Sequence, residues 1–219
     1  KGLREKTLIV FCSDNGGPAP GVVTSNGPLR AGKGTVYEGG VRVPAVAVWP
    51  GRIKAGSVVD VPLHIVDWYP TLVTLAGGST TQARPLDGRD AWAALTQGAP
   101  SPHDDLLVNI TPLGGAVRRG DWKLVVGGRY SDVDGGEADG AGKGGKKGGK
   151  KAAKATDAPQ VELFNLREDP YEKHNLADRE PERVRELRAR LEGYAKAALP
   201  SKQAPRAADF KVPAVWGEK

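Results

Sequence analysis

Two short polar segments in the first forty residues carry side chains that could bind ions. The first is S-D-N-G-G at residues 13–17, directly after the apolar run at residues 7–12. Asp14 offers a carboxylate and Asn15 an amide carbonyl, and such hard oxygens are the ligands that calcium prefers. Calcium takes about six to eight oxygens, so these two residues would supply only part of a site. Because Asn-Gly is also a common turn sequence, a short polar turn is the alternative interpretation.

The second segment is G-P-L-R-A-G-K at residues 27–33, which fits most of the phosphate-binding loop pattern G-x-x-x-x-G-K. Two features argue against a nucleotide site. Gly34 stands where that pattern needs a magnesium-binding Ser or Thr, and Pro28 removes a backbone donor from the loop. Lys33, between two glycines, can still approach an oxyanion closely and supply a positive charge.

The first half of the chain has an α/β pattern that would position these residues. Residues 7–12 (TLIVFC) and 43–49 (VPAVAVW) are continuous apolar runs, which are typical of strands covered on both faces. Asp67 is predicted to cap an apolar helix that ends at Gly77, and a shorter helix is predicted at residues 90–97. Ligands of α/β sheets bind at the carboxyl ends of strands, so the polar segment after residues 7–12 is a candidate site.

The second half of the chain has a different pattern. Short strands are predicted at residues 106–110, 115–119, 122–126 and 161–166. Residues 181–198 place Val184, Leu187, Leu191 and Tyr194 on one face of a predicted helix. Four short strands and one long amphipathic helix predict a small α+β unit.

The net positive charge of the chain comes from one lysine-rich tract. Residues 141–154 hold six lysines and no acid, whereas the whole chain has 32 basic and 26 acidic residues, so the remainder is neutral. We expect the low-complexity segment 134–156 to be a disordered insert. A nucleic-acid-binding tail is the alternative, but the tract has no aromatic residue for base stacking, so no nucleic-acid partner is expected. No apolar run reaches the roughly 18 residues of a membrane span.

Taken in order, the segments of the first half resemble the second signature region of sulfatases. The resembling segments are residues 13–17, residues 27–33 and Y-E-G-G-V-R-V-P at residues 37–44. The resemblance continues through LHIVDWYPTL at 63–72, DG at 87–88, RGDWKL at 119–124, LFNL at 163–166, DP at 169–170, NL at 175–176 and AVWG at 214–217. It covers nearly the whole chain except the Lys/Gly tract, and its ending resembles the arylsulfatase B-like branch.

The resemblance implies a fold and an activity. Residues 1–100 would be the C-terminal part of an alkaline-phosphatase-like α/β domain with a mixed sheet. Residues 101–219 would be an α+β subdomain with a four-stranded antiparallel sheet and a C-terminal helix. The implied activity is calcium-dependent hydrolysis of sulfate esters, with sulfated glycans among the candidate substrates. A periplasmic or secreted location is implied for the parent protein.

The resemblance also implies roles for individual residues. Asp14 and Asn15 fall on calcium ligands of the family. Lys33 falls on the lysine that contacts the sulfate, which makes it the catalytic candidate in this chain. Asn15 and Lys33 are both expected to bind the substrate.

Three other polar residues in the resembling segments are expected to be structural. Glu38 and Arg42 would pair with each other or with the loop backbone. His64 begins the segment before a predicted helix, and we expect it to be a packed or hydrogen-bonded residue rather than a base.

The nucleophile of the family is absent from the 219 residues. In sulfatases, a Cys or Ser within C/S-x-P-x-R is oxidised to formylglycine, whose hydrate attacks sulfur. Cys12 lacks the proline two residues on and the arginine four residues on, and no other position supplies the motif. We therefore expect formylglycine only in a missing N-terminal segment, which would be a partner of this chain. A non-catalytic remnant or binding module with the same fold, and a related phosphoesterase, are the alternatives.

Overall fold

The computed structural model of the chain describes residues 1–18, 24–111, 114–128 and 160–199. The elements of its first half are η1 (Arg4–Lys6), β1 (Ile9–Cys12), α1 (Glu38–Val41), β2 (Ala45–Val48), η2 (Ile65–Asp67), α2 (Trp68–Leu75) and α3 (Trp92–Gln97). Those of its second half are β3 (Leu106–Thr111), β4 (Gly114–Arg119), β5 (Trp122–Val126), β6 (Val161–Asn165) and α4 (Pro181–Ala197). The predicted insert at 134–156 lies outside the described residues. None of the described helices has the length and apolar composition needed to cross a membrane.

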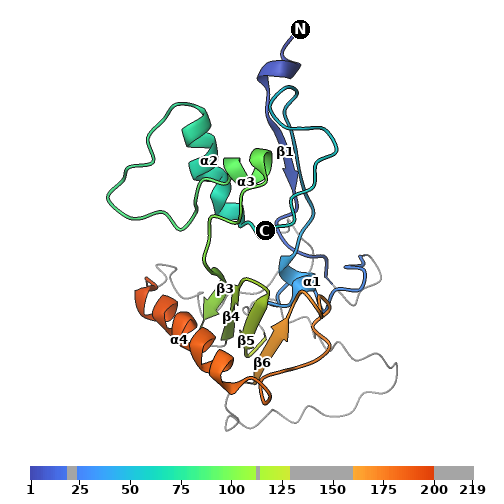
Figure 1. The fold of residues 1–219 in the computed structure, drawn as a ribbon, viewed down its shortest axis with the longest axis vertical. Coiled ribbons are helices and arrows are strands. Elements are labelled where there is room, and N and C mark those ends of the chain that lie inside the picture. Colours follow the sequence, from blue (N-terminus) through green and yellow to red (C-terminus); the bar gives the residue numbers. More distant parts are fainter. Residues whose placement is uncertain (19–23, 112–113, 129–159, 200–219) are drawn as a thin grey trace, which may run out of the picture.

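The first part of the molecule contains a two-stranded sheet with α2 and α3 beside it (Figure 1). β1 pairs antiparallel with β2, and the register places Ile9 opposite Val48 and Phe11 opposite Val46. These four side chains share one face and are all exposed, Ile9 at 59% and Phe11 at 67%. The expectation of strands buried on both faces is therefore wrong for the described chain. A continuous apolar run indicates that both faces favour apolar cover, but it does not show that the same chain provides that cover.

The two helices beside this sheet end as expected. Gly77 (φ +74°) follows α2 and Gly98 (φ +68°) follows α3, so each glycine adopts the left-handed conformation that stops a helix. The predicted capping role of Asp67 is wrong, because its side chain makes no capping hydrogen bond to α2. Asp67 instead accepts hydrogen bonds from the backbone N–H groups of His64 (2.7 Å) and Arg89 (2.9 Å).

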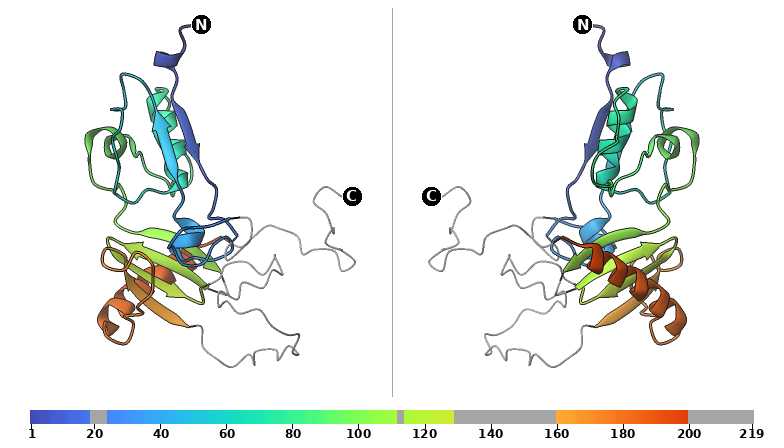
Figure 2. Two further views of the ribbon diagram at one scale, coloured as in Figure 1. Left: turned by 90° about the vertical axis from the view of Figure 1, so that its right-hand side faces the viewer. Right: turned by 90° about the vertical axis from the view of Figure 1, so that its left-hand side faces the viewer.

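The second part of the molecule is a four-stranded antiparallel sheet in the order β3-β4-β5-β6, which contains the four predicted strands in the antiparallel sheet that the resemblance implies. α4 crosses one face of this sheet, as both views in Figure 2 show. The predicted apolar face of this helix is confirmed, because its buried side chains form a core with those of the sheet. That core consists of Val117, Leu124, Leu163, Leu187 and Leu191. We call this side of the sheet the α4 face.

The opposite side of the sheet is covered by a segment from the first half of the chain. Val36, just before α1, is fully buried and packs against Val125 and Phe164. Its backbone N–H also donates to the carbonyl of Gly128, two residues after β5, at 3.2 Å. α1 consequently lies between the end of β1 and the four-stranded sheet (Figures 1 and 2). We call this side of the sheet the α1 face.

Candidate functional site

Asp14 and Asn15 lie at the carboxyl end of β1, where the sequence places them. Oδ1 of Asp14 accepts hydrogen bonds from the backbone N–H (3.0 Å) and the side-chain amide (3.2 Å) of Asn15. That amide also donates to the carbonyl of Gly16 at 3.2 Å. Among the described residues, Oδ2 of Asp14 and Oδ1 of Asn15 have no hydrogen-bond partner. The segment is thus a polar turn that leaves two oxygens available.

These two oxygens are of the type that calcium binds, but they are too few to form a calcium site by themselves. Asp14 is exposed and Asn15 is half-buried, so a carboxylate oxygen and an amide oxygen are both within reach of an ion. Within residues 1–18, 24–111, 114–128 and 160–199, no group of three or more His, Cys, Asp or Glu side chains could hold a metal. Asp14 and Asn15 thus provide two side-chain oxygens, fewer than the roughly six to eight that calcium takes.

Lys33 belongs to a loop that is tied to the turn after β1. Its backbone N–H donates to the carbonyl of Gly17 at 3.1 Å, and its side chain is exposed. Asn26 joins the same two loops. Its Oδ1 accepts from Gly17 N–H (2.8 Å), and its side-chain amide donates to the carbonyls of Gly17 and Ala31, both at 2.9 Å. Sequence reasoning missed Asn26, since Asn-Gly at 26–27 gives only a turn signal.

Glycines allow α1 to approach both loops at backbone distance. The N–H of Gly16 donates to the carbonyl of Gly40 at 2.9 Å, and that of Gly39 donates to the carbonyl of Arg30 at 2.8 Å. A Cβ on Gly16 would lie 1.7 Å from the carbonyl oxygen of Gly39, and one on Gly39 would lie 2.3 Å from that of Ala31. These positions therefore require glycine because no side chain fits between the backbones.

The pairing of Glu38 with Arg42 does not form through their side chains. The Glu38 carboxylate contacts the ammonium of Lys123 at 2.8 Å, on β5 of the sheet. Arg42 is exposed, and its backbone N–H donates to the carbonyl of Glu38 at 2.8 Å. Glu38 is thus a structural residue, as expected, but its partner lies 85 positions along the chain, where no sequence pattern points to it.

His64 is hydrogen-bonded, as expected. Its Nδ1 accepts from the backbone N–H of Val66 at 3.3 Å. A second histidine, His103, contacts Oδ1 of Asp67 through Nε2 at 2.7 Å, and both side chains are at least 92% buried. Because Asp67 also binds two backbone N–H groups, this pair anchors the start of α2 to the segment before β3. It is a structural junction rather than an acid–base pair open to substrate.

Burial and a neighbouring carboxylate shift the pKa of one titratable group next to the candidate site. Tyr37 precedes α1, and its hydroxyl donates a hydrogen bond to Glu162 on β6. Burial raises the pKa of Tyr37 well above its usual value, and the bond to Glu162 raises it further. Tyr37 therefore stays neutral and acts as a hydrogen-bond donor at physiological pH.

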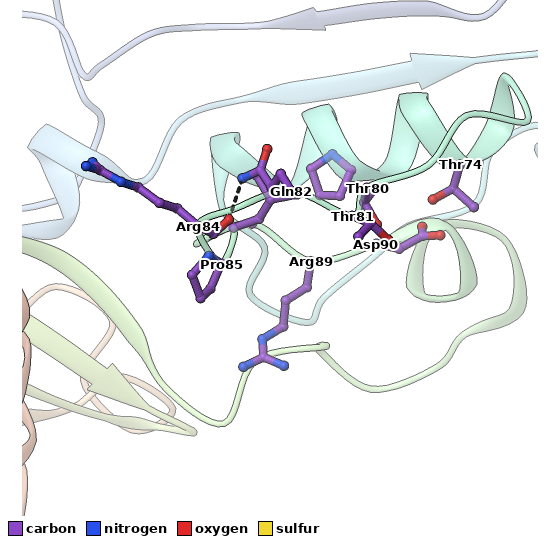
Figure 3. Close-up of a pocket in the computed structure, with 11 residues that line it drawn as sticks. Thr74, Thr80, Thr81, Gln82, Arg84, Pro85, Arg89 and Asp90 are labelled. Carbon is purple, nitrogen blue, oxygen red and sulfur yellow. Dashed lines mark hydrogen bonds between the residues drawn. The ribbon is translucent and has the colours of Figure 1, made fainter.

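Two depressions in the described surface lie away from these residues. One of about 370 Å³ is formed by the loop after α2, which includes Gln82, Arg84 and Arg89 (Figure 3). The Arg84 and Arg89 side chains extend in different directions, and Gln82 donates to the carbonyl of Arg84 at 2.8 Å. Because its charged groups do not converge, this depression lacks the arrangement of a binding site.

Comparison with known proteins supplies the family. Residues 1–79 match the family model described as Sulfatase. The chain is 34% identical to arylsulfatase J of Mus musculus over 226 residues, which cover 94% of this chain and 38% of that relative. It is 33% identical to steryl-sulfatase of Mus musculus over 221 residues, which cover 94% of this chain and 35% of that relative.

A solved structure has the same fold over most of the chain. The crystal structure of Ps i-CgsB aligns with a TM-score of 0.66 at 28% identity, covering 88% of this chain and 37% of that chain. A second structure of Ps i-CgsB is a complex with k-i-k-neocarrahexaose and aligns equally well. The chain spans 35% to 38% of the length of these relatives. Residues 1–79 therefore carry part of a sulfatase-family domain, and nearly the whole chain is similar in sequence to proteins named as sulfatases.

Proposed function

We propose that this chain supplies part of the metal and sulfate site of a calcium-dependent sulfatase. The observation that carries the proposal is the hydrogen-bonded junction of two loops. Asn26 and the backbone of Lys33 both bind the turn that follows β1, so the loop with an exposed ammonium lies next to the loop with two available oxygens. Oxygens for a cation and a positive charge for an oxyanion are the two requirements of a sulfate site.

Each candidate residue would have a distinct chemical role. Asp14 and Asn15 would hold calcium as a charged and a neutral oxygen ligand. When bound, calcium would neutralise charge on the sulfate oxygens. Lys33 would pair with a sulfate oxygen and stabilise the charge that develops as the ester bond breaks. Since C/S-x-P-x-R does not occur in the 219 residues, the proposal assigns the formylglycine nucleophile to a segment outside them.

The exposed face of the two-stranded sheet supports such a partner segment. Ile9, Phe11, Val46 and Val48 form a continuous apolar face, each with 45% to 67% of its surface exposed. Burying such side chains is worth about 1.5–3 kcal/mol each at full burial. Because this face includes β1, which ends two residues before Asp14, a sulfatase segment packed there would reach the candidate metal ligands.

The substrate class is proposed from the relatives. Two of them are named for sulfatase activity on aryl and steryl compounds, and Ps i-CgsB has been crystallised with k-i-k-neocarrahexaose. We propose sulfate esters as the substrates of the complete protein, with carbohydrate sulfates as the leading class.

The test reconstitutes the complete site. The chain would be joined to or mixed with a sulfatase segment that carries formylglycine, and p-nitrophenyl sulfate hydrolysis would be measured. We expect sulfate release that EDTA abolishes and calcium restores. Lys33→Ala should lower kcat by about 10²–10³, the loss expected for one group that stabilises developing charge. Lys54→Ala, which removes another exposed lysine, should change kcat less than twofold and is the matched control.

Two results would overturn the proposal. Hydrolysis of p-nitrophenyl phosphate in preference to the sulfate would indicate a related phosphoesterase. Failure to release either product, although formylglycine is present and the chain is folded, would indicate a non-catalytic member of the family.

A further inference from the structure

A buried charged cluster lies on the α1 face of the four-stranded sheet. Lys123 of β5 is fully buried, and its ammonium lies 2.8 Å from Oε1 of Glu38 and 2.9 Å from Oε1 of Glu172. Glu38 comes from α1, and Glu172 comes from the loop between β6 and α4. We call Lys123, Glu38 and Glu172 the buried trio. It joins three segments that are far apart in the sequence.

Glu172 also holds the backbone at the start of α1. Its Oε2 accepts a hydrogen bond from the N–H of Glu38 at 2.7 Å. Glu172 itself has a φ of +53°, a left-handed conformation that is unfavourable for a residue with a side chain. Such a conformation persists only where surrounding contacts determine it. Glu172 therefore fixes α1 directly through the backbone N–H of Glu38, and indirectly through Lys123, whose ammonium contacts both carboxylates.

α1 transmits this placement to both loops of the proposed site. Its Gly40 accepts from the N–H of Gly16, two residues after Asp14, and its Gly39 donates to Arg30, three residues before Lys33. Because these contacts join backbones with no side chain between them, a displacement of α1 must displace the loops as well.

A second anchor holds the lysine loop to the same face. Nη1 of Arg30 donates to Oε1 of Glu162 at 2.9 Å and to the carbonyl of Glu172 at 3.2 Å. The guanidinium also lies 3.9 Å from the ring centroid of Tyr37, which itself donates to Glu162. The sheet thus contacts the lysine loop directly as well as through α1.

Stability alone is a weak reason for this cluster. Removing three charges from water carries a large desolvation cost, and buried ion pairs are often no more stabilising than apolar residues of similar volume. The α4 face of the same sheet shows that this protein can cover the strands with leucine and valine. What the trio provides, and apolar packing does not, is a fixed distance and direction between the sheet and α1.

We infer that Lys123, Glu38 and Glu172 are positioning residues for the proposed sulfate site, which they hold in place by fixing α1 against the turn after β1 and against the lysine loop. The inference rests on the proposed function for its link to catalysis. The positioning itself can be measured without any activity.

The first experiment uses amide hydrogen exchange of the 219-residue chain. Lys123→Met removes the charge and keeps the length of the side chain. Leu187→Ala, on the α4 face, is the matched control because it weakens the same sheet from the other side. In Lys123→Met, we expect exchange of the Gly16, Gly39 and Gly40 amides to accelerate more than that of amides in α4. In Leu187→Ala, α4 should accelerate more than these three glycines.

The second experiment measures kcat and KM of the reconstituted sulfatase, under conditions where both variants are more than about nine-tenths folded. Misplacement of catalytic groups by an ångström can cost about a hundredfold, so we expect kcat of Lys123→Met to fall by about tenfold to a hundredfold. Leu187→Ala should stay within about twofold of the unmodified enzyme. If Lys123→Met does not fold, Glu172→Gln, which keeps the size and an acceptor for the N–H of Glu38, takes its place in both experiments.

The outcomes separate the two proposals. Uniform acceleration of exchange across the chain, or equal losses of kcat in the α1-face and α4-face variants, would show that the trio acts only on global stability and would overturn the inference. Localised exchange in a reconstituted protein that releases no sulfate would support the positioning and overturn the proposed function.

Discussion

The two faces of the four-stranded sheet bury different kinds of side chains. The α4 face is a continuous apolar core, formed by leucines and valines from the sheet and the helix. The α1 face mixes apolar residues such as Val125 and Phe164 with the buried charges of Lys123 and Glu162. The apolar face stabilises the sheet through area removed from water, whereas the mixed face gives up part of that gain for directed contacts. We conclude that one face supports the fold and the other orients the proposed site.

The largest expected effect on stability tests the α4 face. Leu187 is only 1% exposed and packs against Leu124 and Leu163, so Leu187→Ala should lower the free energy of unfolding by about 2–5 kcal/mol. Urea unfolding followed by circular dichroism would measure it. Leu199→Ala, at a position 70% exposed, should change it by less than about 0.5 kcal/mol. Equal effects of the two substitutions would contradict the assignment of the core to this face.

Glycine-to-alanine substitutions on the two sides of the sheet should change the stability of the chain in opposite directions. In Gly40→Ala, the new Cβ would lie 2.4 Å from the carbonyl oxygen of Thr35, so we expect destabilisation by about 1–3 kcal/mol. Gly193 is inside α4 with open space around it, so Gly193→Ala should stabilise the chain by about 1 kcal/mol. The same unfolding assay measures both. Tolerance of Gly40→Ala would show that α1 can move away from the lysine loop.

The smallest expected effect is a pH dependence on the α1 face. Burial raises the pKa of Glu172 above its ordinary 4.5, and the Lys123 ammonium, which it shares with Glu38, offsets this rise only in part. A carboxyl whose pKa is higher in the folded state contributes stability that is complete below pH 4.5 and is lost as the pH rises through the folded pKa. The unmodified chain should therefore exceed Glu172→Gln in stability most at about pH 4.5, and the difference should shrink towards neutral pH.

The comparison with Glu172→Gln controls for the other charged groups that face Glu172. Lys123, Glu38 and Arg30 are present in both proteins, so the two unfolding series differ only in the carboxyl group of Glu172. Unfolding would be measured in urea at several values between about pH 4.5 and about pH 7.5. A difference that grows with rising pH would show that attraction by Lys123 outweighs burial and that the pKa is lowered.

Most secondary structure of the second half could be predicted because its patterns are local. The periodicity of Val184, Leu187, Leu191 and Tyr194 predicted which face of α4 packs on the sheet, and the structure confirms it. β1 was predicted as a strand correctly but as a covered strand wrongly. The apolar content of a strand indicates that burial of both its faces would be favourable. Whether those faces are buried depends on packing partners that a local pattern does not contain.

The candidate site shows the same division between local and distant information. The types and order of Asp14, Asn15 and Lys33 were enough to propose a cation site and an oxyanion contact, because ligand chemistry belongs to the side chains themselves. Their assigned roles stay predictions. The sequence determined these groups, the helix stops and the strand periods, all of which depend on neighbours a few residues apart. Only the tertiary structure decided that Asn26 joins the two loops and that Lys123 meets Glu38 and Glu172, since those contacts depend on how distant segments pack.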